Sequence, residues 1–179
     1  MTEISKRDVS ISMAKANVYA LIFALPAAIV QVAGFFLVHG IQAFAPQWNI
    51  VLLGVIVMAG VVVHELIHGL SWAFFGKKPY RAIKYGFMWK TLTPYAHIKE
   101  PLEVTAYRRG AFMPGLVLGI IPWLIAMFTG SGDLFWFSLL HATAASGDWL
   151  VLWIIRNVEP GSLVEDHPTN AGCYVLEGV

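Results

Sequence analysis

The stretch VLLGVIVMAGVVVHELIHGLSWAFF, residues 51–75, is apolar for most of its length but carries two histidines and a glutamate near its middle. A run of this length can cross the hydrocarbon core of a membrane as a helix. Ionisable side chains within such a helix are costly, and by default they mark a functional site. His64, Glu65 and His68 are therefore the first candidates for the function of this chain.

The whole chain shares this apolar character. It has 179 residues, of which 58% are hydrophobic and 13% are charged, whereas about a quarter of a soluble domain is charged. Four apolar segments are long enough to span a membrane: 17–38, 51–75, 110–129 and 134–155. We therefore expect an all-α membrane protein with four transmembrane helices in one domain, 17–156. The lipid bilayer is its expected surrounding, and a net charge of +1 gives no reason to expect a nucleic-acid partner.

The positive charges fall on one side of the predicted membrane. All twelve lysines and arginines precede the first segment, follow the fourth, or lie between the second and third. The positive-inside rule then places the N-terminus (1–16), the long loop (76–109) and the tail (157–179) in the cytoplasm. We accordingly predict a multi-pass protein of the bacterial cytoplasmic membrane.

The two longer cytoplasmic segments differ in composition. In the loop, YRAIKYGFMW (residues 80–89) alternates aromatic and β-branched residues, which favours a small β-hairpin lying on the cytoplasmic face. The tail is rich in turn-forming residues, so we expect it to be mostly irregular. The single cysteine, Cys173, excludes an internal disulfide and a zinc site of several cysteines.

The sequence His64-Glu65-Leu66-Ile67-His68 is an H-E-x-x-H motif. On a helix, residues four apart lie on the same face, so His64 and His68 can hold one Zn²⁺ together. Zinc acidifies a bound water, and the glutamate of the motif can take its proton as the water attacks a carbonyl. The motif predicts His64 and His68 as metal ligands and Glu65 as the catalytic base.

A catalytic zinc usually has a third protein ligand. Asp148 and His141, in the fourth apolar segment, lie at depths that bracket the two motif histidines. We prefer Asp148, because an unpaired carboxylate at that depth would be costly and because the small residues around it let another helix pack closely. His141 is the second candidate.

Other polar residues are weaker candidates. The loop residues Glu100 and Glu103, near His97, would have to fold back into the membrane to reach the metal. Asp166 and His167 are adjacent in the turn-rich tail, where a role beneath the catalytic mouth is an alternative to a solvated turn.

Four elements follow one another in an order that carries a resemblance: HELIHG (64–69), AHIKEPLEVTAYR (96–108), SGDWLVLW (146–153) and EDHPTNAGC (165–173). This ordered set resembles a bacterial family of integral membrane proteins described as zincin peptidases. The arrangement is also similar to the site-2 proteases, in which a helix with H-E-x-x-H and a later helix with an aspartate enclose zinc below the membrane surface.

The resemblance implies His64, His68 and Asp148 as zinc ligands and Glu65 as the base. Site-2 proteases usually have glycine after the aspartate, whereas here Gly147 precedes Asp148.

These features together predict a zinc-dependent, membrane-embedded endopeptidase that cuts membrane-associated proteins or peptides near the cytoplasmic face. The loop 76–109 is the expected gate or strand-pairing edge for the substrate. One alternative is a metal transporter or sensor, which would need more polar residues in the outer halves of the helices than Gln31, His39 and His141. The other is a non-catalytic peptide-binding protein, which would be marked by loss of Glu65. The sequence specifies neither the substrate nor the oligomeric state.

Overall fold

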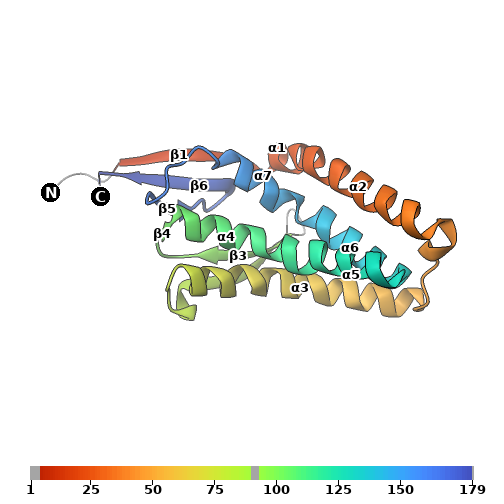
Figure 1. The fold of residues 1–179 in the computed structure, drawn as a ribbon. Helices are drawn as coiled ribbons and strands as arrows, with labels where there is room; N and C mark the ends of the chain where they lie inside the picture. The colour runs from red at the N-terminus through yellow and green to blue at the C-terminus, as the bar shows by residue number, and fades with distance from the viewer. Residues whose placement is uncertain (1–4, 90–92, 179) are drawn as a thin grey trace.

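The computed structural model describes residues 5–89 and 93–178, so residues 1–4, 90–92 and 179 of the predicted N-terminal segment, loop and tail lie outside it. Figure 1 shows helices running lengthwise beside one another, with a β-sheet at one end. The helices are α1 (Met13–Tyr19), α2 (Leu21–His39), α3 (Ile50–Phe75), α4 (Val104–Pro114), α5 (Ile121–Thr129), α6 (Gly132–Ala144) and α7 (Ser146–Ile154).

Three continuous helical stretches are long and apolar enough to cross a membrane: Met13–His39, Ile50–Phe75 and Val104–Thr129. The third joins α4 to α5 through a wider π-helical turn, Gly115–Ile120, between two prolines that cannot donate helical hydrogen bonds. Large apolar side chains stay exposed on these helices, among them Leu37 at 80% and Phe128 at 90%. Exposure of this kind suits contact with lipid tails and indicates a membrane protein.

The fourth predicted span is not one helix. It is divided at Ala145 between α6 and α7, neither of which has the length of a span by itself. The count of four spans is therefore a prediction that the fold does not confirm. The bend at Ala145 places Asp148 in the first turn of α7.

The protein is mostly helical but has more β-structure than the sequence indicated. Four antiparallel strands form a sheet in the order β1-β6-β5-β4, at the left in Figure 1. Their bounds are β1 (Ser5–Ser12), β4 (Leu102–Glu103), β5 (Leu163–Asp166) and β6 (Asn170–Glu177). The expectation of a mostly irregular tail was wrong, because outside β5 and β6 its described residues comprise only the turn at 157–162, residue 178 and the connection 167–169. Residues beyond it pair in register, Asp166 with Cys173 and Val164 with Val175.

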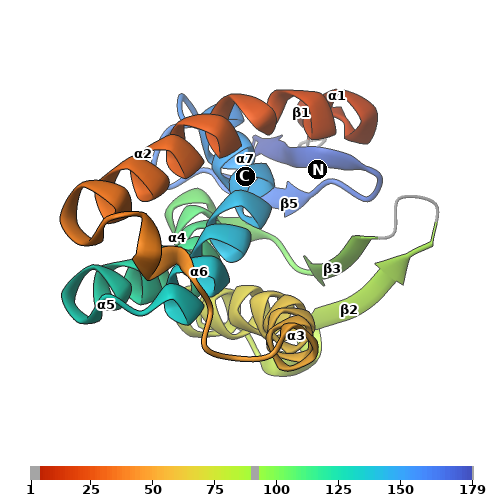
Figure 2. The ribbon, with the colours of Figure 1, turned by 90° about the vertical axis from the view of Figure 1, so that its right-hand side faces the viewer.

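The loop contains the predicted hairpin, with β2 (Ile83–Met88) paired antiparallel to β3 (Thr93–Ile98). In Figure 2, which looks along the helices, the hairpin extends to one side of α3, and its place on the cytoplasmic face stays a prediction. Gly69 makes the approach of the hairpin to α3 possible, since a Cβ there would lie 2.0 Å from the hydroxyl oxygen of Tyr85. The hairpin therefore lies next to the H-E-x-x-H motif.

A hydrophobic core joins α3, the hairpin, α4, α7 and the sheet at this end of the molecule. It comprises Trp72, Ile83, Ile98, Leu102, Val104, Tyr107, Ile155, Val158, Val164, Cys173 and Val175. Burial and the nearby Asp166 carboxylate raise the pKa of the Cys173 thiol to about 12, so the thiol stays neutral. The core fixes α4 and α7 against α3, and those are the helices that build the candidate site.

Two polar anchors hold α4 in place. Glu103 caps its N-terminus and also accepts a hydrogen bond from the backbone of Gly161, 2.8 Å away. Desolvation alone would raise the pKa of Glu103, but these hydrogen bonds outweigh it and lower that pKa. Further along α4, Arg108 donates hydrogen bonds to the backbone oxygens of Ile155 and Val158. These bonds tie α4 to the end of α7.

Candidate metal centre

The histidines of the motif lie on one buried face of α3. His64 and His68 are one helical turn apart, with ring centroids 4.9 Å from each other, and their exposed fractions are 9% and 6%. The spacing predicted this shared face, since the geometry of an α-helix brings residues four apart together.

Asp148 meets both histidines from α7. Its Oδ2 lies 3.0 Å from Nε2 of His64, and its Oδ1 lies 3.2 Å from Nε2 of His68. His64, His68 and Asp148 each offer a ligand atom, and these atoms all lie within 4.8 Å of one another. The structure thus brings together the three residues that the sequence predicted as ligands. Their metal-binding role is a proposal.

The contact between Asp148 and His64 is close without being a hydrogen bond. Asp148 Oδ2 is buried and has no partner of hydrogen-bond geometry among the described residues. A buried carboxylate oxygen without a donor is costly. Ligand atoms around a tetrahedral zinc lie about 3.3 Å from one another, given zinc–ligand distances of about 2.0–2.2 Å. The spacing and the orphaned oxygen therefore both fit a divalent cation held between the three side chains.

A hydrogen bond to α4 orients His68. Its Nδ1 lies 3.0 Å from the backbone oxygen of Gly110. That contact needs a proton on Nδ1, which leaves the lone pair of Nε2 facing Asp148 and available to bind a metal. Trp72 supports the ring from the other side by stacking on His68 at a centroid distance of 5.2 Å, while its own Nε1 donates to the backbone oxygen of Tyr107. Oriented imidazoles of this kind bind metal more tightly.

Glu65 follows His64 and lies against the backbone of Ala96 in β3. The side of α3 that bears Glu65 therefore faces the hairpin edge, beside the metal ligands. A carboxylate beside the metal and next to a strand edge is placed to take a proton from water in front of an extended peptide.

Gly110 provides a test of the orientation of His68. A Cβ at this position would lie 2.0 Å from Cδ1 of Trp72, so Gly110→Ala must displace the indole and pull α4 away from His68. We expect zinc affinity to fall by about 10- to 100-fold, the usual cost of losing a partner that orients a ligand. Competition against a chromophoric chelator measures it. Gly54→Ala, in open space on α3, is the matched control, and equal zinc affinity of the two variants would contradict the proposed role of Gly110.

The remaining candidate ligands have other contacts. His141 is 2% exposed, and its Nε2 packs against Gly60 without a hydrogen-bond partner among the described residues. It is not part of the ligand cluster found there. Glu100 pairs with Lys78 at 3.2 Å, and Glu103 caps α4 as described.

The tail residue Asp166, at the end of β5, contacts two other elements. Its Oδ2 lies 2.7 Å from Nδ1 of His97 in β3, and its Oδ1 accepts a hydrogen bond of 2.8 Å from the hydroxyl of Tyr107. His167 turns to its own loop, where Nδ1 accepts hydrogen bonds from the backbone of Thr169 and Asn170. Sequence reasoning singled out His97 and Asp166 separately but missed their contact, because the strand that carries Asp166 was not predicted.

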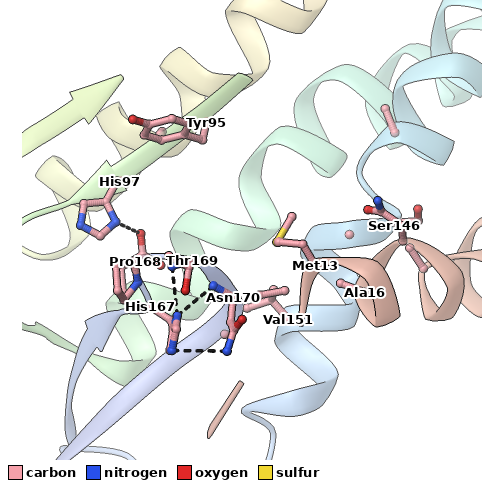
Figure 3. A pocket seen from close by; sticks show the side chains of 18 of the residues that line it. Met13, Ala16, Tyr95, His97, Ser146, Val151, His167, Pro168, Thr169 and Asn170 are labelled. Atoms are coloured by element: carbon pink, nitrogen blue, oxygen red, sulfur yellow. Dashed lines mark hydrogen bonds and ion pairs between the residues drawn. The ribbon is translucent and has the colours of Figure 1, made fainter. Parts of the chain in front are cut away.

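A large cavity adjoins the candidate site. It has a volume of about 820 Å³ and lies between the α1–α2 helix, β3, α7 and the β5–β6 connection, as Figure 3 shows. Ala96 and Gly147, the neighbours of Glu65 and Asp148, are part of its lining. None of His64, Glu65, His68 and Asp148 is itself part of that lining, so the cavity adjoins the cluster through these neighbours.

Comparison with protein families gives one match. The profile of a family described as "Putative zincin peptidase" matches residues 57–163, which include the motif, the hairpin, α4 and Asp148. No curated protein and no solved structure matches the chain. The family name implies zinc dependence and peptidase chemistry, and the resemblance noted from the sequence is confirmed for this family. Since the match covers more than half of the chain, the protein is a member of this zincin peptidase family.

Proposed function

We propose that this protein is a zinc-dependent, membrane-embedded endopeptidase that hydrolyses membrane-associated proteins or peptides near the cytoplasmic face. The convergence of His64, His68 and Asp148, with Glu65 beside them, is the observation that carries the proposal. Two histidines and a carboxylate are a ligand set typical of catalytic zinc, which leaves a position open for water or substrate.

The residues divide the work of hydrolysis. His64, His68 and Asp148 would hold a zinc ion, which would supply a Lewis acid to polarise the scissile carbonyl and make water more acidic. Glu65 takes a proton from the attacking water and delivers it to the leaving amine. The Gly110 carbonyl keeps the His68 imidazole in place, and burial of the two histidines excludes bulk water.

The strand β3 is the proposed docking edge for the substrate. A helical peptide bond is shielded by its own hydrogen bonds, so the substrate must be extended before it is cut. An extended segment can add to a strand edge by main-chain hydrogen bonds. Ala96 in β3 lines the cavity and lies against Glu65, so a segment paired there has its backbone next to the proposed base.

We further propose four membrane-spanning segments, with α6 and α7 together forming the fourth, and both termini in the cytoplasm. The distribution of lysine and arginine supports this orientation. So does the location of β1 and β6, which lie at the same end of the molecule as the C-terminus of α3, where Lys77 and Lys78 follow.

Removal of the metal tests the function. Treatment of the purified protein in detergent with a zinc chelator should abolish cleavage of extended apolar reporter peptides, and added Zn²⁺ should restore it. The reason is that the proposed site depends on zinc to polarise the scissile carbonyl. Cleavage is followed by mass spectrometry of the products. Cleavage that persists after complete removal of zinc would contradict the proposal.

A further inference from the structure

The cavity has two unlike walls. Ala16, Ala20 and Ala24, which recur every fourth residue along α1–α2, form an apolar wall with small side chains. The facing wall is the hairpin, which contributes Lys84, Tyr95 and His97 to the lining. Figure 3 shows Tyr95 and His97 on this side and Met13 and Ala16 across from them.

Lys84 and His97 lie on one face of the hairpin. They are directly opposite each other in the register of β2 and β3, and residues paired in this way point to the same side of a sheet. His97 is also the residue after Ala96, so it lies about 3.3 Å along the strand from the position that faces Glu65. His97 is thus about one residue from the proposed point of cleavage, and Lys84 lies across from it on β2, one strand farther from that point.

Asp166, the carboxylate in this part of the cavity, already has two partners. Both oxygens of Asp166 have partners, Nδ1 of His97 at 2.7 Å and the hydroxyl of Tyr107 at 2.8 Å. The first contact holds the imidazole by Nδ1 and leaves Nε2 free for another group. Lys84, in contrast, takes part in none of the ion pairs between described residues.

We propose that Lys84 and His97 form a subsite for a carboxylate of the substrate, next to the scissile bond on its cytoplasmic side. The inference rests on the proposed peptidase function and names the class of segment that it cuts: an extended apolar strand followed by an acidic group. Asp166 is a positioning residue, since it acts by holding His97. The carboxylate comes from an aspartate or glutamate side chain or from the C-terminus of a peptide, and both sources offer the same chemistry.

Binding to a cleavage-deficient protein tests the subsite. Fluorescent apolar peptides with Glu, Gln or Lys at one position are titrated against Glu65→Gln in detergent, each with a free or an amidated C-terminus. We expect the Glu peptide to bind about two- to fivefold more tightly than the Gln peptide and the Lys peptide to bind most weakly, as for a charge pair with the exposed Lys84. The amidated series shows whether the side chain or the C-terminus is the source.

Charge reversal gives the decisive comparison. Lys84→Glu in the same background should invert the order, so that the Lys peptide binds best, which a loss of folding could not produce. Lys99→Glu, on the same hairpin but outside the lining of the cavity, should keep the original order. An unchanged preference in Lys84→Glu, or an equal change in Lys99→Glu, would overturn the subsite. So would equal displacement of all peptides by phosphatidylglycerol, because the basic residues would then bind lipid.

The two proposals fail in different ways. If the wild-type protein cleaves peptides without regard to charge, the subsite is wrong and the peptidase function stands. If the Glu65→Gln protein shows the charge preference but the wild-type protein cleaves none of the peptides, the subsite stands and the peptidase function is wrong.

Discussion

Glu65→Gln should abolish peptide cleavage and leave the bound metal in place. Glutamine has nearly the same shape as glutamate but cannot accept a proton from the attacking water. General-base catalysis contributes about 10²- to 10⁴-fold to a rate, so we expect the turnover number to fall by that factor. Glu65 is not in the ligand cluster, and therefore zinc content should match that of the wild type.

The measurement pairs a cleavage assay with metal analysis of the same sample. Glu100→Gln is the matched control, since Glu100 lies in the loop and pairs with Lys78. A Glu65→Gln protein that cleaves at the wild-type rate would contradict the hydrolytic mechanism. A wild-type protein that binds zinc but cleaves no substrate would favour the alternative of a metal-binding membrane protein.

Asp148→Ala should produce the second large effect, a loss of zinc. The substitution removes the carboxylate that contacts both histidines, at 3.0 and 3.2 Å, and leaves only two imidazoles to hold the cation. Loss of a direct ligand should weaken binding by more than the roughly 100-fold that follows from loss of an outer hydrogen-bonding partner. Titration with zinc in a competing chelator measures the change.

His141→Ala distinguishes this ligand set from its nearest rival. The histidine packs against Gly60 one turn before His64 on α3, and sequence depth alone did not separate it from Asp148. We expect His141→Ala to bind zinc with the wild-type affinity. The cavity left by the buried side chain should lower only the stability of the protein. A protein that keeps zinc in Asp148→Ala and loses it in His141→Ala would require the third ligand to be reassigned.

The sequence contains enough information to locate the motif but not all of its surroundings. The apolar run guarantees a helix, and helix geometry then puts His64 and His68 on one face. Depth made both Asp148 and His141 candidates, and the cost of an unpaired carboxylate together with the small residues around it favoured Asp148. What could not be read was the bend at Ala145, which divides the fourth apolar segment and orients Asp148.

The β-structure was harder to predict for a physical reason. Strand β1 pairs with β6 at the far end of the chain, and the local pairing of β6 with β5 does not by itself complete a four-stranded sheet. Each strand alone looks like a polar terminal segment, and its pairing is decided by tertiary contacts. The contact between His97 and Asp166 was missed for the same reason, since it depends on where β5 lies.

The hairpin shows a related limit. Alternation in residues 80–89 correctly predicted a hairpin but carried no information about its direction. Its course beside α3 depends on Gly69, whose missing side chain leaves room for Tyr85. A glycine after H-E-x-x-H is visible in the sequence, but only the structure shows which element uses the space.

The most direct test of the proposed metal centre is X-ray absorption at the zinc edge of the wild-type protein purified with its metal. We predict one zinc per chain with two imidazole nitrogens and a carboxylate oxygen at about 2.0–2.2 Å, and a loss of the bound zinc in His68→Ala. A bound zinc whose coordination shell lacks imidazole, or a wild-type protein that binds no zinc at all, would contradict the claim that α3 and α7 hold a metal between them.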